Sequence, residues 1–170
     1  MKPTPRIVFA ATFLACAGLI AYALYLQHAL GLEPCPMCIL QRYAFILVGL
    51  VALAAAIHDP AAVGRRIYAA LVALLAAIGA GVAIRHVWLE HNPPKIFDCG
   101  ADVGYVLESF PLTEALPMIF RGTGDCTKVS WRFLGLSIAE WSLVCFSAIF
   151  VAAIFVLAMK APRAGARGTR

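Results

Sequence analysis

The chain has 170 residues, of which 62% are hydrophobic and 14% are charged. Soluble domains are about 45–50% apolar and about 25% charged, so this composition excludes an ordinary soluble globular protein. The net charge of +5 does not indicate nucleic-acid binding, because the basic residues lie at the ends of long apolar runs and form no binding face.

Four apolar segments are long enough to cross a bilayer, which takes roughly 20 helical residues. They run from about 7 to 26, 39 to 57, 67 to 87 and 138 to 159. The first exceeds the usual apolar run of a signal peptide, about 7–15 residues, and lacks a clear cleavage site, so we expect it to be retained. The small residues Gly79 and Gly81 favour close helix–helix approach. The sequence thus predicts an all-α integral membrane protein: a four-transmembrane-helix bundle over residues 1–162, followed by a basic tail at 163–170.

The basic residues also predict the orientation of the chain. Eight Lys and Arg residues fall on the side that holds both termini and residues 58–66, opposed only by Asp59. The other side carries six Lys and Arg residues against eight Asp and Glu residues. Because positive charge in short loops marks the cytoplasmic face, we expect both termini inside and the loops 27–38 and 88–137 outside.

The outer loop at 88–137 is far longer than a connection needs, and long loops are often functional. Leu112, Leu116 and Phe120 fall at helical spacing, which is typical of a short amphipathic helix on the membrane surface. A loose loop with incidental apolar residues is the alternative. At the end of the loop, Ser137 and Glu140 have the spacing of a capping box and predict the start of the fourth helix.

Four of the six cysteines fall on the outer side, where disulfides persist: Cys35, Cys38, Cys99 and Cys126. Cys16 and Cys145 lie within the first and fourth spans. A thiol in apolar surroundings stays inert, so we interpret these two as packing residues. No neighbouring residue supports a reactive thiol within the membrane.

The strongest local motif is Pro34-Cys35-Pro36-Met37-Cys38, directly before the second span. Pro36 suits the first turn of a helix, so Cys38 should lie in that turn, where a helix N-terminus favours the thiolate. Arg42 is one turn further along the same face and could stabilise the Cys38 thiolate or donate to an oxygen of a bound acceptor. Snorkelling to the membrane interface is the alternative role for Arg42.

The second pair, Cys99 and Cys126, is open to three interpretations. It could form a structural disulfide within the loop. All four outer cysteines could instead bind one zinc ion, which takes four tetrahedral ligands. In the third interpretation the two pairs work in series: electrons pass from a soluble partner to the loop pair, then to Cys35 and Cys38, and then to an acceptor such as a lipid-soluble quinone.

The run EPCPMCILQR at residues 33–42 resembles the signature of the DsbB family of bacterial inner-membrane disulfide-bond formation proteins. Other parts of the outer loop are similar to the same family: Arg85-His86-Val87-Trp88-Leu89, Cys99, Gly124-Asp125-Cys126 and residues 131–136. The resemblance covers nearly the whole chain and includes the four spans with both ends inside.

The resemblance implies a protein-dithiol:quinone oxidoreductase that reoxidises the periplasmic thiol oxidase DsbA and passes the electrons to ubiquinone or menaquinone. Cys99 would form the mixed disulfide with DsbA, and Cys126 would be its partner. Cys35 would receive electrons from the loop pair, while Cys38 would face the quinone with support from Arg42.

His86 and His91 lie where the family can place a polar residue near the quinone, although interfacial solvation is an alternative role for each. We expect no resident metal in the enzyme. The rival function is a membrane scaffold whose outer cysteines form structural disulfides or a metal site.

Overall fold

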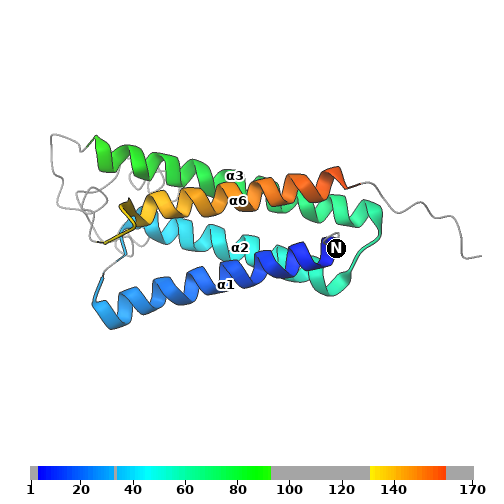
Figure 1. Cartoon of the computed structure of the whole chain (residues 1–170), viewed down its shortest axis with the longest axis horizontal. Helices are drawn as coiled ribbons and strands as arrows, with labels where there is room; N and C mark the ends of the chain where they lie inside the picture. The colour runs from blue at the N-terminus through cyan, green and yellow to red at the C-terminus, as the bar shows by residue number, and fades with distance from the viewer. Residues whose placement is uncertain (1–3, 33, 93–130, 160–170) are drawn as a thin grey trace, which may run out of the picture.

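The computed structural model describes residues 4–32, 34–92 and 131–159. Four long helices lie side by side along one axis (Figure 1). They are α1 (Pro5–Leu30), α2 (Pro36–His58), α3 (Ala62–His91) and α6 (Ile138–Ala158), and a two-stranded hairpin of β1 (Arg132–Phe133) and β2 (Leu136–Ser137) precedes α6. The α1–α2 connection and the hairpin lie at the same end of the bundle, which we call the outer end; the α2–α3 connection lies at the opposite end.

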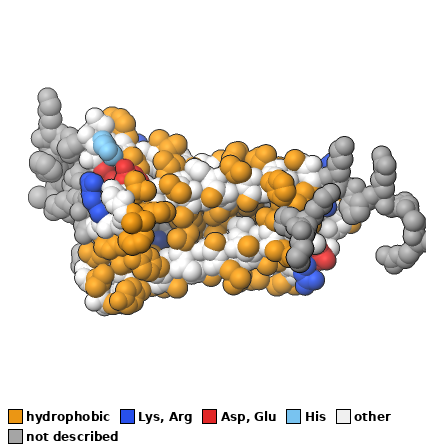
Figure 2. Space-filling view, viewed as in Figure 1, with side chains coloured by type: hydrophobic (Ala, Val, Ile, Leu, Met, Phe, Trp, Pro, Cys, Tyr) orange, Lys and Arg blue, Asp and Glu red, His pale blue; other side chains and the backbone are white. Residues whose placement is uncertain are grey.

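All four helices are long and apolar enough to span a membrane, with 21 to 30 residues each. Figure 2 shows apolar side chains along the flank of the bundle and charged ones gathered at its two ends. A lipid-facing surface explains why many large apolar side chains are exposed, Ile57 at 68% and Val151 at 66% among them. The predicted fold class is therefore confirmed. The amphipathic helix expected in the long loop lies outside the described residues.

Local sequence signals explain where these helices begin and end. Prolines stand in the first turns of α1 and α2, and α1 ends at Gly31, whose φ of 65° suits a residue without a side chain. The predicted capping box of α6 is confirmed: Ser137 Oγ accepts from the Glu140 amide at 3.2 Å, and the Ser137 amide donates to Glu140 Oε2 at 2.7 Å.

The helices pack through small residues and one aromatic pair. Phe45 of α2 and Phe146 of α6 stack at 3.9 Å between ring centroids, 8° from parallel. A Cβ on Gly79 of α3 would lie only 2.4 Å from the Phe146 ring, so this glycine lets α3 approach α6. The same prediction was wrong for Gly81, where a Cβ would meet no atom within 4 Å among the described residues.

The hairpin before α6 was not expected from the sequence. Arg132 pairs with Ser137 and Phe133 with Leu136, across a turn in which Leu134 and Gly135 both have positive φ, 51° and 84°. Two central residues with positive φ make the tight type I′ geometry that suits the twist of a hairpin. The hairpin brings the chain back over the outer end of the bundle, immediately before the helix cap at Ser137.

Candidate active site

A cavity of about 460 Å³ occupies the outer end of the bundle. All four helices and the hairpin contribute to its walls, which are mainly apolar, with Leu19 and Ile20 on α1 and Ile138 on α6 among them. Helix α1 packs mainly along α2, and α6 packs mainly along α3, so α1 and α6 face each other across the cavity with little direct contact. This size and lining suit the ring of a lipid-soluble molecule.

Cys35 and Cys38 both line this cavity. Cys35 is the N-cap of α2, and its Sγ accepts a hydrogen bond of 3.2 Å from the Cys38 amide. Cys38 therefore lies in the first helical turn, as predicted. The two sulfur atoms and a ring nitrogen of His86 lie within 4.8 Å of one another. A helix N-terminus beside two sulfurs favours thiolate and hence disulfide exchange.

Arg42 reaches from α2 toward α1. Its Nη1 donates to Gln27 Oε1 at 2.6 Å, and its Nη2 donates to the carbonyl oxygen of Ala23 at 3.2 Å. The side chain also lines the cavity, which places a permanent positive charge beside a largely apolar space. Two acceptors on α1 thus hold the guanidinium in a fixed position.

His86 lies at the centre of a buried polar chain. Its Nε2 is 3.6 Å from Cys35 Sγ, and its Nδ1 is 3.2 Å from Gln41 Nε2. Glu90 Oε1 lies 3.9 Å from the same Nε2, and Glu90 Oε2 accepts a hydrogen bond of 2.7 Å from Ser137 Oγ. Polar residues in a membrane bundle are costly to bury and therefore point to function.

His91, the other histidine predicted to approach the quinone, is placed differently. It is exposed at the end of α3, and its Nδ1 lies 2.9 Å from the carbonyl oxygen of Val87 in its own helix. His86 is among the described residues that line the cavity, whereas His91 is not. The structure therefore places His86 in the wall of the cavity and His91 outside it, while the quinone contact expected of each stays a prediction.

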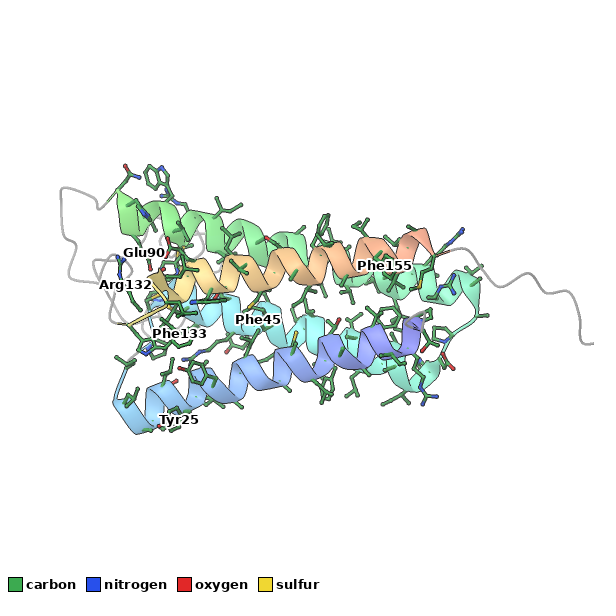
Figure 3. The ribbon with its side chains drawn as sticks, in the orientation of Figure 1. Tyr25, Phe45, Glu90, Arg132, Phe133 and Phe155 are labelled. Carbon is green, nitrogen blue, oxygen red and sulfur yellow. The ribbon has the colours of Figure 1, made fainter. Side chains whose placement is uncertain are left out.

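Aromatic side chains form one wall of the cavity. Trp131 meets Tyr22 of α1 edge-on at 5.9 Å and stacks on Phe133 at 5.8 Å, measured between ring centroids. Trp141 Nε1 donates to the carbonyl oxygen of Phe133 at 3.0 Å. Figure 3 shows Phe133, Arg132 and Glu90 at the outer end, with Phe45 deeper in the bundle.

Sequence reasoning missed several of these residues. Trp131 and Trp141 were not predicted to line a cavity, because the sequence alone does not show that Trp131 lies against Tyr22 of α1. Gln41 had a usable signal: it is an uncharged polar residue inside an otherwise apolar span, and such residues are uncommon without a function. Glu90 stood in a boundary region where acidic residues are unremarkable.

The other cysteines divide into three groups. Cys99 and Cys126 lie outside the described residues. Cys16 is 2% exposed and belongs to the hydrophobic core, in agreement with a packing role. Cys145 packs against that core and also lines the cavity.

Two cysteines of the alternative zinc site, Cys35 and Cys38, are among the described residues. Tetrahedral zinc needs four ligands, and within the described parts of the chain Cys35, Cys38 and His86 supply three closely spaced donor atoms. The zinc site formed by all four outer cysteines would need Cys99 and Cys126, which the structure does not describe.

Comparison with known proteins decides the family. A profile of the family described as "Disulfide bond formation protein DsbB" matches residues 5–156. The chain belongs to the DsbB family. A "Disulfide bond formation protein B" of Aromatoleum aromaticum is 56% identical over 155 residues, covering 91% of this chain and 93% of that protein. The protein of the same name from an Azoarcus species is 55% identical, covering 89% of this chain and 92% of that protein. The one from a Polaromonas species is 50% identical, covering 90% of each chain.

Membership in the DsbB family confirms the predicted class of function. The protein is a multi-pass oxidoreductase of the inner membrane that takes part in disulfide formation and uses a quinone. The scaffold alternative loses its support, because the family is one of redox enzymes.

Proposed function

We propose that this DsbB protein reoxidises a periplasmic DsbA-type thiol oxidase through Cys99 and Cys126, which then reduce the Cys35–Cys38 pair. The electrons leave through Cys38 to a quinone whose head group sits in the cavity at the outer end. The observation that carries this proposal is that both cysteines of the CxxC motif line a cavity that is otherwise largely apolar. A lipid-soluble acceptor suits such a space better than a water-soluble one.

Each step in the protein is a thiolate–disulfide exchange, in which one S–S bond forms as another breaks and an electron pair moves inward. The first transfer joins the partner to the loop pair, and the second joins the loop pair to Cys35 and Cys38. The N-terminus of α2 stabilises the thiolates of this second pair. Bound quinone supplies the two-electron acceptor for the last step.

The residues around the cavity fit such an acceptor. Arg42 presents a guanidinium that can donate to a quinone oxygen, and the rings of Tyr22, Trp131 and Trp141 offer flat apolar surfaces. Because α1 and α6 barely touch, an isoprenoid tail can pass between them into the lipid. Either ubiquinone or menaquinone satisfies these contacts, so the proposal includes both.

The test is quinone reduction by purified protein in detergent, with a reduced DsbA-type partner as electron donor. We expect the unmodified protein to turn over and both Cys38→Ala and Cys99→Ala to lose turnover by at least about a thousandfold, because each removes a sulfur that no other group replaces. Cys16→Ala is the matched control and should keep turnover, since this cysteine lies in the core. Turnover that persists in Cys38→Ala would overturn the proposed route.

The contact with the partner is tested by a further variant. A Cys126→Ala protein should trap a mixed disulfide with the thiol oxidase through Cys99, visible on a non-reducing gel. If the trapped species forms through Cys35 in place of Cys99, the loop pair does not serve as the entry point.

A further inference from the structure

We propose that His86 is a catalytic residue of the thiol step: its neutral imidazole donates a hydrogen bond from Nε2 to Cys35 Sγ and stabilises the Cys35 thiolate, while Gln41 holds the ring in the required tautomer. The inference deepens the proposed function and rests on it for the identity of the reacting sulfurs. It assigns His86 to the cysteine pair, whereas the family resemblance suggested only a place near the quinone.

The tautomer follows from the contact between Gln41 and His86. Gln41 presents its amide nitrogen, a donor, to Nδ1 at 3.2 Å. Nδ1 must therefore accept, and a neutral ring then carries its hydrogen on Nε2. An imidazolium would place a second hydrogen on Nδ1, against the amide N–H of Gln41. The arrangement thus selects the neutral ring with Nε2 as a donor.

Among the described residues, Cys35 and Glu90 both lie near the Nε2 hydrogen, and the distances decide between these two. Cys35 Sγ lies at 3.6 Å, which is within the range of a hydrogen bond to the large sulfur atom. Glu90 Oε1 lies at 3.9 Å, beyond the usual 2.7–3.2 Å for a nitrogen–oxygen hydrogen bond. Glu90 is engaged on its other oxygen by Ser137 Oγ at 2.7 Å. The donor is consequently directed at sulfur.

Burial makes this hydrogen bond consequential. Cys35, Gln41 and His86 are 8%, 2% and 4% exposed. A hydrogen bond to a charged acceptor is stronger than one to a neutral acceptor, and it is not weakened by competing water at a buried site. With the Cys38 amide at 3.2 Å, Nε2 provides a second donor to the Cys35 sulfur.

The same two donors act in both directions of exchange. When the second loop cysteine breaks the mixed disulfide between Cys35 and the first loop cysteine, Cys35 leaves as a thiolate and its charge is stabilised. When Cys35 attacks, it reacts as the thiolate. His86 donates a hydrogen bond throughout and keeps its proton, so no proton acceptor is needed at this nitrogen.

Other charged and titratable groups around Cys35 must be considered in any pH measurement. The described charged and titratable residues that share its cavity are Tyr22 on α1, Cys38 and Arg42 on α2, His86 and Glu90 on α3, and Cys145 on α6. Glu140 lies one step further away, beyond Ser137. Arg42 donates to α1, and Glu90 accepts from Ser137, the N-cap of α6. The His86 ring nitrogen is the group of this set that lies 3.6 Å from Cys35 Sγ.

The test compares two substitutions of similar size and polarity. The side-chain nitrogen of glutamine lies near the position of Nε2 of histidine, and that of asparagine near Nδ1. His86→Gln can therefore still donate to Cys35, whereas His86→Asn cannot reach it. A merely structural role for His86 would be affected about equally by both.

The measurement is the pH dependence of Cys35 alkylation in the full-length protein, without quinone or partner. Cys38, Cys99 and Cys126 are changed to Ser, which keeps the backbone donor at residue 38, and mass spectrometry identifies the labelled peptide. We expect His86→Asn to slow alkylation at neutral pH about tenfold, equivalent to one unit in the half-ionisation point of the thiol. His86→Gln should stay within about twofold of the parent. Equal effects of the two substitutions would overturn the proposal.

A second measurement needs no substitution of His86. The ¹⁵N chemical shifts of its ring should show hydrogen on Nε2 and none on Nδ1, and Gln41→Leu should remove this preference. Hydrogen on Nδ1 in the unmodified protein would overturn the proposal. Neither measurement involves quinone reduction, so loss of the proposed route to quinone would be seen separately from loss of the His86 role.

Discussion

Arg42 is bound by two acceptors that belong to another helix. Gln27 Oε1 and the Ala23 carbonyl oxygen on α1 receive two separate N–H groups of the guanidinium, at 2.6 and 3.2 Å. A planar donor fixed at two points loses less freedom on binding a ligand than a mobile side chain does. Gln27 is therefore a positioning residue for Arg42, although it does not itself line the cavity among the described residues.

Replacing Gln27 with Leu should raise the KM for quinone. A hydrogen bond to a charged group is worth about 1.5–3 kcal/mol, so loss of this one should increase KM about tenfold or more while thiol exchange with the partner stays unchanged. Steady-state quinone reduction at several quinone concentrations measures the effect. Gln27→Glu keeps an acceptor and should restore a KM close to that of the unmodified protein. An unchanged KM in Gln27→Leu would remove Gln27 from the site.

At the scale of helices, the contact between α3 and α6 depends on the absence of one side chain. Gly79 lies against Phe146, which stacks on Phe45 of α2, so three helices meet at this point. Phe45 also lines the cavity. The packing of α2, α3 and α6 and the shape of the site are therefore coupled through one aromatic pair.

Gly79→Ala should destabilise the bundle by about 1–3 kcal/mol, the usual effect of overpacking, because its Cβ would lie 2.4 Å from the Phe146 ring. Gly81→Ala is the matched control two residues away. The added Cβ would have no neighbouring atom within 4 Å among the described residues. The substitution should therefore be neutral or stabilising by up to about 1 kcal/mol, because alanine has a higher helix propensity than glycine. Reversible unfolding in mixed detergent micelles measures both. Equal losses for the two variants would show that the Phe146 contact is not the cause.

The difference between Gly79 and Gly81 also shows what sequence can predict here. Hydropathy predicted four spans, because a bilayer demands about 20 apolar residues whatever the partners are. Pro36 and the Ser137–Glu140 pair predicted helix starts, because the signals at a helix N-terminus are local. Which of two nearby glycines faces a neighbouring helix depends on the rotation of α3, and that is set by packing and not by local sequence.

The candidate site was partly predictable for the same reason. Cys35, Cys38 and Arg42 lie within eight residues, so helical spacing alone placed them together. Gln27, Gln41 and His86 come from three helices, and their convergence is a tertiary fact. The aromatic wall needed the hairpin at residues 132–137, whose positive-φ turn at Leu134 has no strong sequence signal.

For the whole molecule, charge at the two ends predicts the orientation. Of the described residues, Arg6, Arg65 and Arg66 lie at the end that holds the α2–α3 connection, with Asp59 close to Arg6 at 4.0 Å. Arg65 is 7% exposed and donates to the carbonyl oxygen of Met159 at 2.9 Å, where a cation suits the C-terminal end of α6. We infer that this end is cytoplasmic and that the cavity faces the periplasm.

Reporter fusions check this orientation. Alkaline phosphatase, which folds only in the periplasm, should be inactive when fused after residue 170 or within residues 59–61, and active when inserted within residues 110–125. A fluorescent protein that folds in the cytoplasm should give the opposite pattern at the C-terminus. An active phosphatase at residue 170 would place the cysteine pair on the wrong side for a periplasmic partner.

Cys35 is the N-cap of α2 and also belongs to the redox pair. The oxidation state of this pair is therefore linked to the geometry of the first turn of α2. As a thiolate, its sulfur is a charged acceptor for the Cys38 amide; in a disulfide, it is a weak, neutral one. Oxidation therefore loosens the first turn of α2, and reduction tightens it. Gln41, which contacts His86, and Arg42, which contacts α1, lie one turn further along the same helix. The positions of these two residues are therefore mechanically connected to the oxidation state of Cys35.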